Sequence, residues 1–339
     1  MPYQRLITSL GLAATTLGSL AMADVLDRRR IAKDPLADRL ASPPPGEEHV
    51  VAARDGTRLH AETYGPADAP PVVLVHGWTC ALRFWRLQAH DLAHDHRVIA
   101  YDLRGHGRSG SPDGGDWSLD AMGDDLQAVL EALAGDRPAL VAGHSLGAMA
   151  IVAWAGRHAD VVGERAAAAA LLNTGIGDLV TESLLIPTPG LLGRATDLLG
   201  TGLLSAAAPL PSRPNPLSHR AVRFVALSPQ APPAAVRFSE DLVLSCTPRV
   251  RAGCGRELSR LDLRAYVKQL TVPTLVVAGI EDRLTPPVHA RGLASTLPNC
   301  AGMLELEDTG HMAPLERDGE VTAALRELAA RHVPGARVS

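Results

Sequence analysis

A serine flanked by glycines, set between an apolar run and a helical pattern, constrains this chain more than any other feature. Residues 143–147 read Gly-His-Ser-Leu-Gly, directly after the apolar run 140–142 and before the helical pattern 148–157. A turn this tight strains the backbone of its central serine, and only small residues such as Gly143 and Gly147 fit around it. It lifts the Ser145 hydroxyl beside the N-terminus of the following helix, whose free N–H groups favour negative charge. The pattern therefore predicts a strand, a serine nucleophile and a helix in immediate succession.

Apolar runs along the rest of the chain predict the sheet to which this turn belongs. Residues 49–53 and 58–64 flank an Asp55-Gly56 turn, which is a hairpin signal. Short apolar runs then alternate with helical patterns, at residues 72–75, 98–101, 140–142, 167–172, 274–278 and 303–306. Continuous apolar strands separated by helices are typical of a parallel sheet that is covered on both faces. We therefore expect an α/β fold with a mostly parallel central sheet and helices on both faces.

One long interval interrupts this alternation. Residues 175–270 contain no convincing strand, are rich in proline and include apolar helical pieces such as residues 191–199. A stretch of this length is uncommon as a loop inside a compact domain. We expect a helical cap or lid insertion at 175–270, an α/β core at 47–174 and 271–333, and an N-terminal segment at 1–46 that ends in a proline-rich linker at 34–46.

The first residues have a composition of their own. Residues 6–23 carry no charge, Arg5 precedes them, and three arginines follow at 28–30. This stretch fits a signal segment with a small-residue cleavage site at 21–23, a membrane anchor, or an apolar helix packed on the body of the protein. All three interpretations stay open. Membrane association through residues 6–23, and an exported or anchored location, therefore stand beside a cytoplasmic one.

Overall charge excludes one class of partner. The formal net charge is -4, no dense stripe of Lys and Arg occurs, and aromatic residues make up only 3% of the chain. A surface that neutralises phosphates or stacks on bases is not expected from such a composition. We therefore expect no nucleic-acid partner.

The cysteines do not indicate a disulfide framework. Four cysteines are too few for one at this length. Cys246 and Cys254 are close enough in sequence to form a bridge in an exported protein, but buried or loop thiols are the favoured interpretation. The sequence does not indicate the oligomeric state.

Two further motifs make the chain resemble the α/β-hydrolase family. His76-Gly77-Trp78 follows the predicted strand 72–75, where the family places its oxyanion loop. Residues 102–109 are similar to the family's D-x-R-G-x-G-x-S turn, which is structural more than catalytic. The resemblance covers residues 50–330, apart from the insertion. It implies an oxyanion hole made by the backbone N–H groups of Trp78 and Leu146. The residues that shape the motif turns are then His76, Gly77, Gly143, His144 and Gly147.

The same resemblance implies a base and an acid for Ser145. In this family the base lies on a loop after the last strand, where His311 occurs with Glu316 shortly behind it. The acid ends a G-x-x-D motif after the preceding strand, which matches Asp282; Glu281 is its nearest competitor. A serine hydroxyl is a weak nucleophile without such a base, and the acid holds the tautomer of the base. The chain order Ser, Asp, His is the one expected for this fold.

A second group of histidines offers an alternative chemistry. The group consists of His90, His94 and His96, with Asp91 and Asp95 between them. It could bind a metal, but the polar end of a helix is the favoured interpretation. A serine triad needs no metal and no cofactor, and we expect neither.

The nucleophile narrows the class of reaction. Haloalkane dehalogenases and epoxide hydrolases of this family carry aspartate in place of Ser145, and epoxide hydrolases also use tyrosines of the insertion, where this chain has only Tyr266. Proline-type aminopeptidases hold a free amine with acidic residues there, a role open to Glu182, Glu240 and Asp241. The insertion is otherwise apolar, which favours a small-molecule ester or acyl substrate with a hydrocarbon part. We expect a carboxylesterase or lipase-like hydrolase.

Several alternatives stay open on the same residues. Within enzymes they are a cofactor-free haloperoxidase or perhydrolase, a thioesterase and a C–C hydrolase. Outside enzymes, some relatives of this fold are ligand receptors that keep a pocket. The shape of the insertion and details of the oxyanion loop distinguish these functions, and the sequence does not reveal them.

Overall fold

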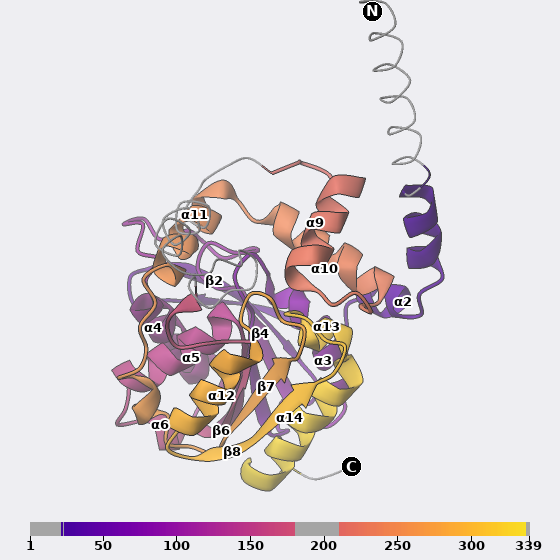
Figure 1. The fold of residues 1–339 in the computed structure, drawn as a ribbon. Coiled ribbons are helices and arrows are strands. Elements are labelled where there is room, and N and C mark those ends of the chain that lie inside the picture. Colours follow the sequence, from indigo (N-terminus) through magenta and orange to yellow (C-terminus); the bar gives the residue numbers. More distant parts are fainter. Residues whose placement is uncertain (1–21, 23, 180–209, 337–339) are drawn as a thin grey trace, which may run out of the picture.

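Eight strands form one sheet in the computed structural model, which describes residues 22, 24–179 and 210–336 (Figure 1). The strands are β1 (Glu47–Ala52), β2 (Arg58–Tyr64), β3 (Pro71–Val75), β4 (Arg97–Tyr101), β5 (Ala139–His144), β6 (Ala166–Leu172), β7 (Thr274–Gly279) and β8 (Cys300–Leu306). Their spatial order is β1-β2-β4-β3-β5-β6-β7-β8. The pairs β1–β2 and β2–β4 are antiparallel and all others are parallel. The predicted strands and the mostly parallel α/β fold are confirmed.

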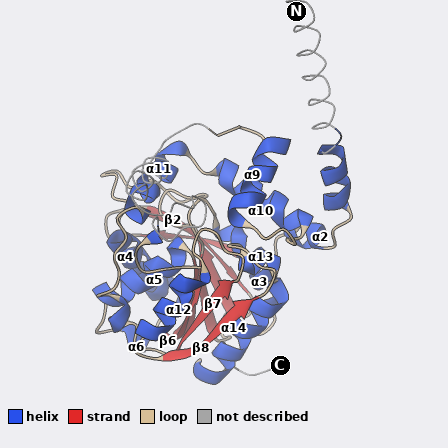
Figure 2. Ribbon diagram, in the orientation of Figure 1, coloured by secondary structure: helices blue, strands red, loops and turns tan. Residues whose placement is uncertain are grey.

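Helices cover both faces of the sheet (Figure 2). One core cluster takes in α4 (Leu119–Val129), α5 (Leu146–Arg157) and α12 (Pro287–Thr296), and the other takes in α3 (Arg86–Leu92) and α14 (Asp318–His332). Strand β3 illustrates the two-sided burial, because Val73 and Val75 belong to the first cluster whereas Val72 and Leu74 belong to the second. All four side chains are fully buried. Such strands are apolar at every position, which explains the continuous runs in the sequence.

Short helices complete the connections within the core. They are η1 (Leu82–Trp85), η2 (Leu130–Ala134), α6 (Val162–Arg165), η4 (Val267–Gln269) and α13 (Ala313–Glu316).

A glycine allows α5, which carries the serine turn, to lie close against α4. A methyl group at Gly123 of α4 would lie 2.8 Å from the backbone nitrogen of Trp154 in α5. Real side-chain carbons do not come this close to a backbone atom, so any larger residue would push the helices apart. Trp154 is fully buried, and its indole N–H donates to Gln127 of α4 at 2.7 Å.

The described residues between β6 and β7 are mostly helical. They form α9 (Pro216–Ala226), α10 (Pro233–Ser245) and α11 (Pro248–Leu258), which Figure 1 shows on one side of the molecule. Each of the three helices begins with proline at a first helical position, where the missing N–H costs nothing. The prolines of this interval therefore partly mark helix starts. The apolar piece predicted at 191–199 lies outside the described residues.

The predicted linker at 34–46 is in part a packed element rather than a free connection. It contains α2 (Leu36–Ala41), in which Leu36 and Leu40 are buried in the second core cluster. Arg39 of the same helix pairs with Asp91 of α3 at 2.9 Å and with Asp318 of α14 at 2.5 Å. The prolines of this segment suggested a linker. The contacts of α2 were not predictable from them, because its partners in α3 and α14 are distant in sequence.

The N-terminal segment and the cysteines had each left an alternative open. The apolar stretch 6–23 lies, except for Met22, outside the described residues. No helix within the described ranges is long and apolar enough to cross a membrane.

All four cysteines are free, so the interpretation of Cys246 and Cys254 as thiols is confirmed and the disulfide interpretation is wrong.

Candidate active site

Ser145 lies at the sharp turn between β5 and α5. Its backbone has φ 52° and ψ −118°, a region that side chains other than glycine rarely occupy. The conformation is held because its N–H donates to the carbonyl of Leu172 in β6 at 2.9 Å. A methyl group at Gly143 would lie 2.6 Å from the nitrogen of Ala148, and one at Gly147 would collide with the carbonyl of β3. The glycines are therefore required by close backbone approach, as predicted.

The backbone around Leu146 and Trp78 borders the serine. Leu146 is the first residue of α5, and the first α5 hydrogen bonds to the carbonyl of Ser145 come from Ala148 and Met149, so the Leu146 N–H belongs to the free donors of the helix start. Trp78 follows Gly77, where a methyl group would lie only 3.1 Å from the Cβ of Ser145. Both predicted oxyanion donors therefore belong to segments that lie next to the nucleophile.

His76 fixes the loop that carries Trp78. Its side chain is fully buried, its Nδ1 donates to the carbonyl of Gly77 at 2.8 Å, and its Nε2 accepts from the N–H of Leu103 at 3.0 Å. Burial lowers the pKa of His76, although the charge of Asp102 opposes this. The neutral ring ties the loop after β3 to the loop after β4.

Asp282 and His311 form a buried pair. His311 Nδ1 lies 2.8 Å from Asp282 Oδ2, while the residues are only 5% and 0% exposed. Asp282 follows β7 and His311 follows β8, so neighbouring parallel strands bring their loops together. The pairing engages Nδ1 of His311 and not the opposite ring nitrogen, Nε2. Glu281 is the competing acid. Its backbone N–H donates to the carbonyl of Thr309 at 2.8 Å, whereas the carboxylate that pairs with His311 is that of Asp282.

Further donors hold Asp282 in place. Its Oδ1 accepts from the N–H groups of Leu284 and Thr285 at 2.9 Å each. Its Oδ2 accepts from the hydroxyl of Thr285 at 2.8 Å and from the amide of Asn173 at 3.0 Å. Burial opposes ionisation of Asp282, but the charge of His311 and these hydrogen bonds outweigh it and lower the pKa of the carboxyl.

Asn173 supports the candidate site, and sequence reasoning missed it. It directly follows β6, adopts a positive φ of 48° and donates to both Asp282 Oδ2 and the carbonyl of Gly310 at 3.1 Å. It thus links the loops of the acid and the histidine. An asparagine directly after an apolar strand was the available signal, because asparagine tolerates the left-handed region.

His144 and Glu316 hold the histidine loop against the serine turn. His144 Nε2 donates to the carbonyl of His311 at 2.7 Å, and the two rings lie 4.9 Å apart. Glu316 accepts from the N–H groups of Ser228, Gly310 and Met312 at distances of 2.8 to 3.1 Å. The residue before Ser145 and the backbone of His311 are therefore in direct contact, across 167 positions of sequence.

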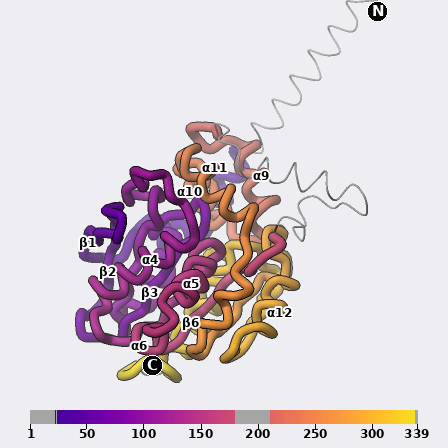
Figure 3. Tube along the Cα trace, turned by 90° about the vertical axis from the view of Figure 1, so that its left-hand side faces the viewer, coloured from indigo at the N-terminus to yellow at the C-terminus, as the bar shows by residue number. Residues whose placement is uncertain are grey.

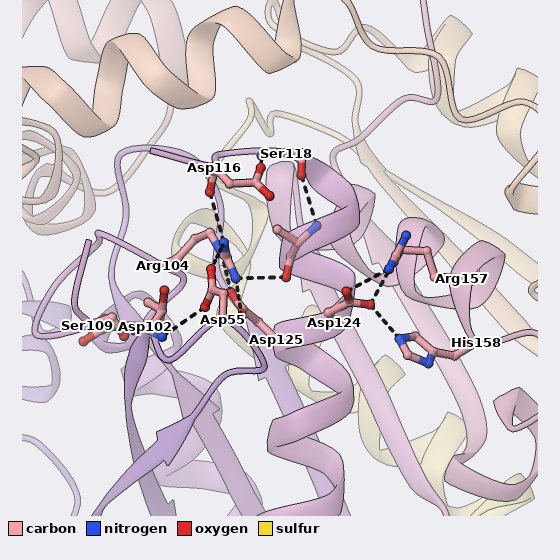
Figure 4. A network of polar contacts seen from close by, with 12 residues as sticks. Asp55, Asp102, Arg104, Ser109, Asp116, Ser118, Asp124, Asp125, Arg157 and His158 are labelled. Carbon is pink, nitrogen blue, oxygen red and sulfur yellow. Dashed lines mark hydrogen bonds and ion pairs between the residues drawn. The ribbon is translucent and has the colours of Figure 1, made fainter. Parts of the chain in front are cut away.

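The motif at 102–109 serves the fold, as predicted. Arg104 is 2% exposed and donates to both carboxylate oxygens of Asp125 at 2.7 Å, to Asp55 at 3.0 Å and to the carbonyl of Asp116 at 3.0 Å (Figure 4). Beside this network, Arg157 of α5 pairs with Asp124 of α4 at 2.8 Å. A charged hollow of about 480 Å³ beside this network is lined by these paired groups and stays apart from Ser145.

Two other groups of side chains from the sequence analysis have structural partners. In the cluster at 90–96, Asp91 pairs with Arg39 at 2.9 Å and Asp95 pairs with Arg326 at 3.0 Å, so both of its carboxylates have arginine partners. Glu240 is fully buried, and its carboxylate accepts hydrogen bonds from the N–H of Asn215 and from the side chains of Ser218 and His219. Asp241 pairs with Arg237, and Tyr266 packs on Gly156 of α5. Glu182 lies outside the described residues.

Comparison with known proteins agrees with this architecture. A family model described as alpha/beta hydrolase fold matches residues 70–318. The chain is 28% identical over 251 residues to a bifunctional esterase/perhydrolase of Acinetobacter calcoaceticus, which covers 70% of this chain and 83% of that protein. It is 39% identical over 109 residues to a non-heme chloroperoxidase of Streptomyces lividans, a match that spans 32% of this chain and 39% of that protein.

Solved structures share the fold over most of the chain. A thermophilic esterase from Thermogutta terrifontis superposes with a TM-score of 0.67 at 23% identity, covering 84% of this chain and 98% of that one. An enol-lactonase from Burkholderia xenovorans superposes with a TM-score of 0.65 at 24% identity, covering 83% and 100%. At these identities the superpositions show a common fold.

Proposed function

We propose that this chain, which belongs to the alpha/beta hydrolase fold family, is a serine hydrolase that cleaves carboxylic esters through an acyl-enzyme. The observation that carries the proposal is the buried Asp282–His311 pair, held against the turn of Ser145 by the hydrogen bond from His144 to His311. A strained serine with an oriented histidine beside it is the arrangement that acyl transfer needs.

The proposed mechanism assigns one role to each residue. Ser145 Oγ attacks the ester carbonyl while His311 Nε2 takes its proton. The resulting imidazolium is stabilised by Asp282, whose lowered pKa keeps it ionised. The N–H groups of Trp78 and Leu146 bind the oxyanion, commonly the largest contribution to such catalysis. His311 then protonates the leaving alcohol. In the second half of the reaction His311 takes a proton from water, the water attacks the acyl carbonyl, and Ser145 leaves with the proton from His311.

We assign an apolar acyl or alcohol part to the substrate, with the segment 175–270 as the cap that contacts it. The C-terminal end of α9 borders the catalytic loops, because the carbonyl of Ala226 accepts the N–H of His311 at 2.9 Å. Phe224 of the same helix is 60% exposed and lies under the guanidinium of Arg283, the residue after Asp282. An exposed aromatic ring at this position supports a hydrocarbon-bearing substrate.

The names of two relatives favour a second candidate function. One is a bifunctional esterase/perhydrolase and the other a non-heme chloroperoxidase. The same triad could pass the acyl group from Ser145 to hydrogen peroxide instead of water, which would form a peracid. Thioester hydrolysis and C–C cleavage would use the same nucleophile and base.

Hydrolysis of p-nitrophenyl esters from acetyl to palmitoyl tests the proposal. Wild-type turnover should be lost in Ser145→Ala and retained in Ser295→Ala, because Ser295 is exposed on α12. The preferred chain length measures the acyl pocket, and peracid formation from acetate and hydrogen peroxide tests the second candidate. Equal activity in wild type and Ser145→Ala would refute the assignment of the nucleophile.

A further inference from the structure

A histidine and two glutamates meet on one face of the β1–β2 hairpin, away from the proposed active site. The antiparallel register places Glu48 of β1 opposite Glu62 of β2. Residues two apart on a strand share a face, so His60 lies on the same side as Glu62. Figure 3 shows β1 and β2 together at one edge of the molecule. The ligand atoms of the three side chains all lie within 4.8 Å of one another.

His60 has an unused nitrogen aimed into this group. The residue is 5% exposed, and its Nδ1 lies 3.1 Å from Asp102 Oδ2. Both oxygens of Asp102 already accept hydrogen bonds, Oδ1 from the N–H of Leu82 at 2.7 Å and Oδ2 from the N–H of Arg108 at 2.9 Å, so Asp102 acts as an acceptor toward His60 as well. Nδ1 therefore donates, which leaves the lone pair of His60 on Nε2. This buried Nε2 has no hydrogen-bond partner, and it lies 3.7 Å from Glu62 Oε1.

The two carboxylates are held in different ways, because Glu62 keeps one oxygen free of hydrogen bonds whereas both oxygens of Glu48 contact Arg108. The hydroxyl of Tyr64 donates to Glu62 Oε2, so Oε1 is the oxygen that faces His60. Glu48 is exposed and forms a paired contact with Arg108, at 2.6 Å and 2.9 Å. An exposed ion pair of this kind is weak because water screens it, so Glu48 can exchange Arg108 for a stronger partner.

We propose that His60, Glu62 and Glu48 form a binding site for a divalent zinc ion. His60 Nε2 and one oxygen of each glutamate supply three ligands, and water completes the tetrahedron. Ligand atoms about 2.0–2.2 Å from a tetrahedral zinc lie roughly 3.3 Å apart. The 3.7 Å between His60 Nε2 and Glu62 Oε1 needs only a small contraction to reach this spacing.

The surroundings of the three ligands match those of known zinc sites. A histidine that binds zinc usually donates its other ring N–H to a carboxylate, as His60 does to Asp102, and ligating carboxylates are themselves hydrogen-bonded, as Glu62 is by Tyr64. The imidazole ligand favours zinc over magnesium and calcium, which prefer oxygen atoms alone. The competing occupant is a proton on Nε2, which would make His60 an imidazolium paired with Glu62.

Calorimetric titration of zinc chloride into the full chain, after treatment with EDTA, distinguishes these occupants. We expect one zinc ion per chain at this site. His60→Asn keeps a side-chain N–H for Asp102 and removes Nε2, and Glu62→Gln keeps an acceptor for Tyr64 and removes the charge. Loss of an orienting partner costs about 10–100-fold in metal affinity, so loss of a ligand should cost at least that. The matched control is His158→Asn, because His158 also pairs with an aspartate, Asp124, at 2.9 Å.

Two results would overturn the proposal. One is zinc affinity in His60→Asn equal to that of the wild type and of His158→Asn. The other is an anomalous diffraction peak, in wild-type crystals soaked in zinc, that lies elsewhere than between His60 and Glu62. Glu48→Gln is a second ligand variant that should not disturb folding, because Glu48 is exposed at the sheet edge. We expect it to lower the zinc affinity as well.

Discussion

Acid should destabilise this protein through His144, a buried neutral imidazole beside the proposed active site. Its Nε2 donates to the carbonyl of His311 at 2.7 Å, and its Nδ1 has no hydrogen-bond partner. Burial, together with the neighbouring His311, lowers the pKa of His144 to about 3. An imidazole in the unfolded chain has a pKa of about 6.5. Between these values only the unfolded state binds the proton, so the stability is complete above the unfolded pKa and is lost as the pH falls toward the folded one.

The size of the effect follows from the two pKa values. Lowering the pH from about 7 to about 5 protonates nearly every unfolded imidazole and almost no folded His144, which removes about 2 kcal/mol of unfolding free energy. Burial also lowers the pKa of His106 to about 3, which adds to the loss on acidification, whereas burial raises the pKa of Glu316, which acts in the opposite direction. The wild-type slope therefore sums several groups. His144→Gln isolates one of them, because the glutamine amide can donate to His311 but does not titrate.

Urea unfolding followed by circular dichroism, at pH about 7 and about 5, measures the difference. The loss of unfolding free energy on acidification should be about 2 kcal/mol smaller in His144→Gln than in the wild type. His94→Gln, which replaces an exposed histidine, should follow the wild-type curve. Equal losses in His144→Gln and the wild type would refute the reasoning, because His144 would then accept a proton in the folded state.

Three further substitutions test the site and its support. Asp282→Asn should lower kcat for ester hydrolysis about 10⁴-fold without unfolding the protein, because His311 loses its orienting anion; unchanged kcat would contradict the assigned acid. Gly147→Ala should lower kcat about 100-fold, because the added methyl meets the carbonyl of β3 and displaces the serine turn; wild-type kcat in the folded variant would contradict this. Asp125→Ala should lower the free energy of unfolding by about 3–5 kcal/mol in urea titration, since it leaves the buried charge of Arg104 without its main partner. Replacing both members of that pair with apolar residues should cost less, and an equal cost would argue against the explanation by unpaired charge.

The sheet was predictable because strands that are buried on both faces are apolar at successive positions. The strands between Pro71 and Leu172 consist mainly of continuous apolar runs, and the antiparallel hairpin was marked by its Asp55-Gly56 turn. The proposed nucleophile Ser145 follows such a strand, whereas the resemblance to the family supplied the proposed acid Asp282 and the proposed base His311. Their loops then meet through the order of strands in the sheet, which the pattern of the fold supplies.

What the sequence did not predict depends on contacts between distant segments. Asn173 bonds to Asp282 across 109 positions, and neither residue type signals the other. Helix α2 is short and begins at a proline, and it is stabilised by Arg39, which reaches partners 52 and 279 positions away. Glu48 lies one residue before the predicted strand 49–53, and Asp102, the partner of His60, lies on another loop, so the sequence did not indicate this cluster.

The wide sequence separation within the proposed site has a consequence for how the chain matures. The contact between His144 and His311 closes a loop of 167 positions. The loop that carries His311 follows β8, the last strand of the chain. Contacts of such long range form late, because the entropy of loop closure must be overcome before they contribute. A nascent chain synthesised from its N-terminus would present the serine turn well before the base exists. The cell would therefore hold no active intermediate during synthesis, and in refolding the return of activity should lag behind the return of helical signal.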